Sequence, residues 1–194
     1  FCIGTGFAVR FTVPRAVLKN VYAMPLPQTE GGDEMILLED SRQQVGKHKN
    51  IELYCKRHNI TLIRQKLDVG DYAFPDGKIS VDTKQDLLEI SKDIMSNDHR
   101  RFKAECQRAQ EWGIQLIILV EEIPPFGQVD LWNVPIWKTS NRYHRYGDPM
   151  TLVNPAALKK AMQTMTEKYG VKFRFCHKRE TPRKVIRYLK GELK

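Results

Sequence analysis

From Ile36 onward, short apolar segments alternate with segments in which apolar residues recur at helical spacing. The segments expected to be strands are 36–38, 61–74, 78–84, 114–120 and 171–176. The segments expected to be helices are about 47–58, 87–94, 98–112, 154–170 and 181 onward. Because helices that return the chain must cover apolar strands, this alternation predicts an α/β fold with a mixed central β-sheet flanked by helices on both faces.

One predicted strand pair has a turn signal of its own. Pro75-Asp76-Gly77 is expected to fold strand 61–74, which we expect to bend near Gly70, back onto strand 78–84. The two strands would then form a β-hairpin.

Two segments stand outside the alternation. Residues 1–35 have no acidic residue before Glu30, and we interpret them as an N-terminal arm, which places the folded domain at 36–194. Residues 124–150 combine prolines with several aromatic side chains, including Trp132 and Trp137. We expect an insertion or a long loop there.

Charge and composition narrow the classes of partner. The formal net charge is +9, and residues 171–194 hold nine Lys or Arg against two Glu. This excess fits a polyanionic partner and fits a solvated basic surface equally well. No apolar run approaches the roughly 20 residues that span a bilayer, so we expect no membrane partner. Four scattered cysteines without a CxxC pair argue against a zinc module and fit a cytoplasmic protein.

Three charged side chains are expected to converge on the hairpin. Asp82 and Lys84 lie two positions apart on a strand and therefore point to the same face. The turn brings Asp71 close to them. Two carboxylates repel each other at such a site, and Mg²⁺, which takes carboxylate, water and phosphate oxygens, would relieve the repulsion. The predicted chemistry is metal-dependent phosphodiester hydrolysis, in which Lys84 stabilises either the attacking water or the developing negative charge.

The order of Gly70-Asp71-Tyr72 and Val81-Asp82-Thr83-Lys84 resembles the PD-(D/E)xK nuclease superfamily, and specifically the XPF-type nuclease domain of structure-specific DNA endonucleases. The resemblance covers about 36–193 and includes Asp40-Ser41-Arg42 after the first strand. It implies a restriction-endonuclease-like core and a DNA endonuclease that uses Mg²⁺ or Mn²⁺. It also implies activity on branched or flap DNA in repair or recombination.

The resemblance further implies the residues of the site. The catalytic set would be Asp40, Asp71, Asp82 and Lys84. The metal ligands would be Asp71, Asp82, Asp40 and the backbone carbonyl of Thr83. The residues that contact DNA would be Arg42, Arg100, Arg101 and Arg108, although the last three also fit the solvent face of a helix.

The sequence departs from the family pattern at three positions, and two of the departures, Asp82 and Gln43, keep an alternative open. The family usually has Glu at the positions of Asp82 and Gln43, and an acid at the position of Leu88, four residues after the lysine. Asp86 or Glu89 could replace that acid. The alternative function is a catalytically inactive nuclease-fold module that binds DNA or acts as a scaffold.

The remaining expectations concern partners and location. No nucleotide cofactor is expected, because Gly46-Lys47 lacks the upstream glycine of a phosphate loop. Relatives imply a homodimer through the terminal helices, and the apolar side of the last helix, with Val185, Ile186 and Leu189, could serve either the core or a partner. The compact length implies a bacterial or phage-like form that acts in the cytoplasm of a bacterial or phage-infected host cell.

Overall fold

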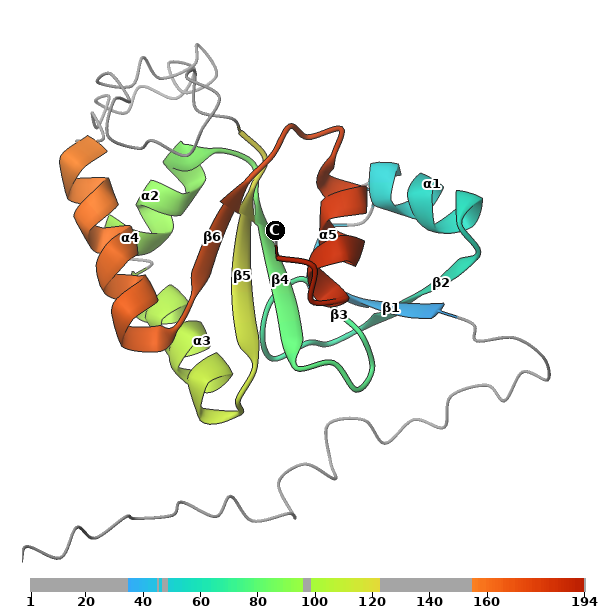
Figure 1. The fold of residues 1–194 in the computed structure, drawn as a ribbon, viewed down its shortest axis with the longest axis horizontal. Helices are drawn as coiled ribbons and strands as arrows, with labels where there is room; N and C mark the ends of the chain where they lie inside the picture. Colours follow the sequence, from blue (N-terminus) through green and yellow to red (C-terminus); the bar gives the residue numbers. More distant parts are fainter. Residues whose placement is uncertain (1–34, 45, 47–48, 96–98, 123–154, 194) are drawn as a thin grey trace, which may run out of the picture. The chain divides into compact units, whose positions relative to one another are not determined.

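The computed structural model describes residues 35–44, 46, 49–95, 99–122 and 155–193 (Figure 1). The expected insertion at 124–150 lies outside the described residues, and so does the expected arm at 1–35 except for Met35, which begins the first strand. Among the residues described, no helix is long and apolar enough to cross a membrane.

A six-stranded mixed sheet forms the centre of the fold, in the order β2-β1-β3-β4-β5-β6. Its strands are β1 (Met35–Asp40), β2 (Ile60–Gln65), β3 (Tyr72–Ala73), β4 (Ile79–Lys84), β5 (Gln115–Val120) and β6 (Lys172–Phe175). The pairs β1–β2, β4–β5 and β5–β6 are parallel, whereas β3 runs antiparallel to both β1 and β4. The expected mixed sheet is confirmed.

Helices cover both faces of the sheet, as the sequence predicted (Figure 1). One face carries α1 (Lys49–Arg57) and α5 (Thr181–Leu189), and the other carries α2 (Leu87–Met95), α3 (His99–Glu111) and α4 (Pro155–Tyr169). Strand β5 explains why two layers form: Ile118 packs in one core and Ile117 in the other, and both are fully buried. A strand buried on both faces has a continuous apolar sequence.

One expected strand is two strands in the structure. Segment 61–74 contains β2 and β3, which lie on opposite sides of β1 and do not pair with each other. The chain must therefore cross the end of β1 between residues 66 and 71, and it does so with Gly70 at φ +70°. The hairpin itself is present between β3 and β4, where the Gly77 N–H donates to the Phe74 carbonyl at 3.1 Å.

The apolar side of α5 belongs to the core of the chain. Val185, Ile186 and Leu189 are buried together with Ile51 of α1 and Leu119 of β5. Of the two roles left open for this side of the helix, the structure shows the core role.

Candidate active site

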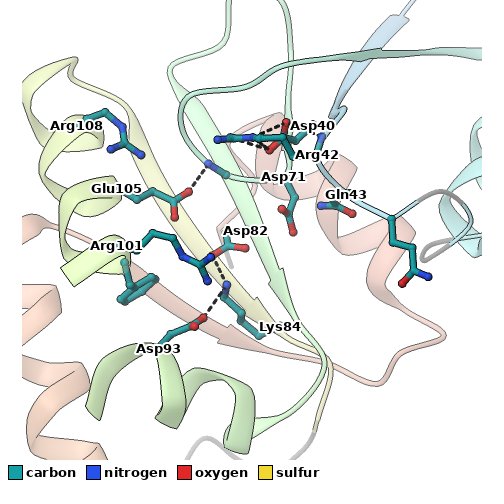
Figure 2. A pocket seen from close by; sticks show the side chains of 13 residues that line it. Asp40, Arg42, Gln43, Asp71, Asp82, Lys84, Asp93, Arg101, Glu105 and Arg108 are labelled. Carbon is teal, nitrogen blue, oxygen red and sulfur yellow. Dashed lines mark hydrogen bonds and ion pairs between the residues drawn. The ribbon is translucent and has the colours of Figure 1, made fainter. Parts of the chain in front are cut away.

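The charged residues selected from the sequence gather in one pocket at the carboxyl ends of β1 and β4 (Figure 2). Four of them were the expected catalytic set: Asp40, Asp71, Asp82 and Lys84. Three of the expected DNA-binding arginines also line the pocket: Arg42, Arg101 and Arg108. Arg100 is exposed and is absent from the lining.

Asp71 is fixed by both neighbouring strands. Its carbonyl accepts the Asp40 N–H at 2.8 Å, and its N–H donates to the Val81 carbonyl at 2.8 Å. Its carboxylate Oδ2 accepts the N–H of Thr83 at 2.9 Å and the Thr83 hydroxyl at 2.6 Å. Neither of these bonds uses Oδ1, so one oxygen of the carboxylate can serve a ligand.

Lys84 lies between two carboxylates. Its Nζ is 3.0 Å from Asp82 Oδ2 and 2.9 Å from Asp93 Oδ2, and it lies 5.9 Å from the centre of the Phe102 ring. Burial alone would lower the pKa of Lys84, but Asp82 and Asp93 together outweigh burial and raise it. Lys84 is therefore an ammonium ion at neutral pH. As an ammonium ion it can stabilise negative charge.

The acids of the pocket outnumber the lysine that faces them. Burial raises the pKa of Asp82 well above its usual value, and Asp71 and Glu105 raise it further against the opposing effect of Lys84. Burial likewise raises the pKa of Glu105, although the Gly70 N–H donates to its Oε1 at 2.7 Å. A bound cation would relieve this repulsion.

Asp40 has a different environment from Asp71 and Asp82. Its Oδ1 accepts the N–H of Leu67 at 3.3 Å and that of Arg42 at 3.2 Å, and its Oδ2 lies 2.8 Å from Arg42 Nε. The hydrogen bond to Asp40 is the main reason that the pKa of Arg42 is raised. The carboxylate thus ties the loop after β1 to Leu67, and its role as a metal ligand stays a prediction.

The acid that contacts Lys84 from outside the strand is Asp93, not Asp86 or Glu89. The Asp86 carboxylate accepts the Glu89 N–H at 2.8 Å, and the Glu89 carboxylate accepts the Gln85 N–H at 2.8 Å. These bonds satisfy backbone donors at the start of α2, where a helix has no internal acceptors. Neither Asp86 nor Glu89, the two residues left open as replacements for an acid at Leu88, lines the pocket.

Two acids of the pocket were missed from the sequence: Asp93 on α2 and Glu105 on α3. Each follows a buried apolar residue by three positions, Ile90 and Phe102 respectively. This spacing places an acid beside the buried face of its helix. It was the only local signal that could have identified them.

The arginines of α3 differ in their contacts. Arg108 donates Nε and Nη2 to the Asp68 carbonyl at 3.2 and 3.1 Å, so it also holds the segment between β2 and β3. Arg101 is exposed and lines the pocket from α3 (Figure 2). The expected DNA-contacting group is thus divided: Arg42, Arg101 and Arg108 face the pocket, and Arg100 does not.

Within the described part of the chain, no group of three His, Cys, Asp or Glu residues is arranged to hold a metal ion. A metal in this pocket would therefore rely on two protein carboxylates. Mg²⁺ is commonly bound by one or two carboxylates, with water and substrate phosphate completing its shell. Asp71 and Asp82 fit that kind of site.

Comparison with known proteins identifies the class of fold first. The similar solved structures include XPF from Aeropyrum pernix and the same protein in complex with DNA, each with a TM-score of 0.54. The first is 20% identical and the second 17%, over 80% and 81% of this chain. This chain covers 64% of either structure, which is less than two thirds of their length. The fold is therefore that of XPF-type nuclease structures.

The family follows from the sequence match. The ERCC4 domain model matches residues 39–189, so this chain belongs to the ERCC4 domain family, the XPF-type nuclease family. No curated protein matches the chain. The resemblance drawn from Gly70-Asp71-Tyr72 and Asp82-Thr83-Lys84 is confirmed at the level of the family.

Proposed function

We propose that this chain is a metal-dependent endonuclease that hydrolyses phosphodiester bonds in branched or flap DNA during repair or recombination. The observation that carries the proposal is the convergence of Asp71, Asp82 and Lys84 in one pocket lined by arginines. Membership of the ERCC4 domain family supports it. So does the likeness to an XPF structure in complex with DNA.

The ion would be Mg²⁺ or Mn²⁺, held by Asp71 and Asp82. Asp71 has Oδ1 outside its bonds to Thr83, and Asp82 is a buried acid at 4% exposure whose ionised form needs a cation nearby. The N–H and the carbonyl of one strand residue point to the same side of the strand. Because the Thr83 N–H faces Asp71, its carbonyl would also point toward Asp71 and would be a further ligand. When bound, the ion polarises the scissile phosphate and lowers the pKa of a water molecule that it binds.

The chain's own residues would supply the remaining functions. Lys84 would place a permanent positive charge beside the phosphate oxygen that gains negative charge, and its burial would make that interaction stronger than in water. Arg101 and Arg108 would contact phosphates next to the one that is cleaved. These phosphate contacts would position DNA without reading its sequence.

A cleavage assay tests the proposal directly. Flap, splayed-arm, junction and linear DNA would be incubated with the protein in Mg²⁺, Mn²⁺ or EDTA. We expect cleavage only with an ion, and its loss in Asp71→Asn, Asp82→Asn and Lys84→Met. Arg100→Ala is the matched control, because Arg100 lies outside the pocket. Cleavage in EDTA, or activity of Asp71→Asn equal to the wild type, would refute the metal mechanism.

The scaffold alternative makes a different prediction for the same proteins. An inactive module would bind DNA without cleaving any of the four substrates. It would also show no specific Mn²⁺ binding by calorimetry that disappears in Asp71→Asn. DNA binding with neither cleavage nor such an ion site would replace the proposed function with the scaffold role.

The homodimer stays a prediction. The apolar side of α5 is buried inside the chain, so a dimer would need another surface. Analytical ultracentrifugation at increasing protein concentration would measure whether one forms.

A further inference from the structure

Lys84 receives its two carboxylate partners from different elements of the fold. Asp82 lies on the same strand, β4, and Asp93 lies on α2, which is a separate layer (Figure 2). Asp93 is only 8% exposed and its side chain contacts Lys84 at 2.9 Å. Placing a buried carboxylate there is costly unless it is paired, so its contact with Lys84 accounts for its position.

The two partners would not be equivalent in a working nuclease. In the proposed function Asp82 also binds the metal, so its charge would be shared between the ion and Lys84. The ion would itself repel the Lys84 ammonium at short range. Asp93 is not a proposed metal ligand, so it would be the carboxylate that continues to hold Lys84 when the metal ion is bound.

We propose that Asp93 is the positioning residue that holds the Lys84 ammonium at the scissile phosphate, an inference that rests on the proposed nuclease function. It acts through Lys84 and does not contact the substrate itself. Four residues after the lysine, where the family usually has an acid, this chain has Leu88. Asp93 supplies a carboxylate from further along the same helix.

The surroundings of Asp93 make it suitable for this role. It lies between Ile90 and Ile94, which are 0% and 5% exposed and pack in the core beneath α2. The start of the helix is fixed by the Leu87 N–H, which donates to Glu122 Oε2 at 2.9 Å. A carboxylate on a helix anchored at its start and along its buried face can hold a partner in one geometry.

Steady-state cleavage of flap DNA separates positioning from folding. Asp93→Asn keeps the shape and an acceptor oxygen but loses the charge, and Asp93→Leu loses both. We expect kcat to fall about 10- to 100-fold in Asp93→Asn and further in Asp93→Leu, while KM for DNA changes little. Asp93→Glu restores the charge and should recover part of kcat. Asp86→Asn is the control, since Asp86 caps the same helix outside the pocket.

A second measurement does not depend on cleavage. A buried and hydrogen-bonded ammonium exchanges its protons slowly, so the ¹H–¹⁵N signal of Lys84 Nζ should be visible by NMR and should be absent from Lys84→Arg. The signal is expected to persist in Asp86→Asn and to disappear in Asp93→Leu. Thermal melting would establish that each variant is folded.

The outcomes distinguish the two proposals. If the wild type cleaves no DNA but the ammonium signal depends on Asp93, the proposed function fails and the hold of Asp93 on Lys84 stands. If Asp93→Leu keeps the signal, or if Asp93→Asn cleaves with the kcat of the wild type, the positioning role is overturned. A rise in KM with unchanged kcat would also overturn it, because it would indicate a contact with DNA.

Discussion

Among the glycines in the described part of the chain, Gly70 is the one whose substitution should cost most. It has a φ of +70°, and a Cβ added there would lie 2.2 Å from Ser80 Oγ and 3.1 Å from the Val81 carbonyl. The left-handed backbone alone costs a residue with a side chain about 1–2 kcal/mol. Overpacking of a buried site costs about 1–3 kcal/mol more. We therefore expect Gly70→Ala to lower the free energy of unfolding by about 2–5 kcal/mol.

Gly113 provides the matched control. It has nearly the same backbone, with φ +65°, but a Cβ there would meet nothing within 4 Å. Gly113→Ala should therefore cost only the conformational part, about 1–2 kcal/mol. The difference between the two variants measures the close contact of Gly70 with Ser80.

Urea unfolding followed by circular dichroism would measure both free energies, with equal m-values showing that the unfolded states are comparable. A third variant sharpens the test. In a Ser80→Gly background the 2.2 Å contact no longer exists, so Gly70→Ala should cost less than in the wild type. If Gly70→Ala costs no more than Gly113→Ala, or if the cost is the same in both backgrounds, the steric reasoning is refuted.

Three further predictions concern the pocket. Because folding raises the pKa of Asp82, the native protein holds the Asp82 proton more tightly than the unfolded chain does. The free energy of unfolding should therefore fall as pH rises from about 4 to the raised pKa. In EDTA, Asp82→Asn should remove the part of this decrease that Asp82 causes. Asp40→Asn should lower the free energy of unfolding by about 1–3 kcal/mol but should weaken Mn²⁺ binding less than Asp71→Asn does. Equal losses of Mn²⁺ binding in calorimetry would instead support Asp40 as a metal ligand. Arg101→Ala should reduce the slope of the logarithm of the DNA-binding constant against the logarithm of the salt concentration by about one, with binding measured by fluorescence anisotropy. Arg100→Ala should leave that slope unchanged, and equal slopes would refute the division of the arginines.

The elements of the fold could be predicted largely from local patterns. All five expected helices are present, because apolar residues at helical spacing mark the face that each helix buries. The error at 61–74 has a non-local cause. Whether a run of strand-forming residues continues or crosses its neighbour depends on the order of strands in the sheet, and the order β2-β1-β3 has no signature within the run itself.

The site was predictable where one hairpin built it. Asp71, Asp82 and Lys84 converge because strand alternation and one turn determine their positions. Asp93 and Glu105 reach the same pocket from helices, and their positions depend on how α2 and α3 dock against β5. No spacing along the chain specifies that docking.

Thr83 occupies the position that a DxK pattern leaves unspecified. In this chain its N–H and its hydroxyl both bind Asp71 Oδ2, so the residue between the two charged ones orients a carboxylate on the neighbouring segment. A motif search that treats the position as a wildcard discards this information. A mutational library that randomises it should return serine, which keeps the hydroxyl, far more often than valine, which keeps only the shape.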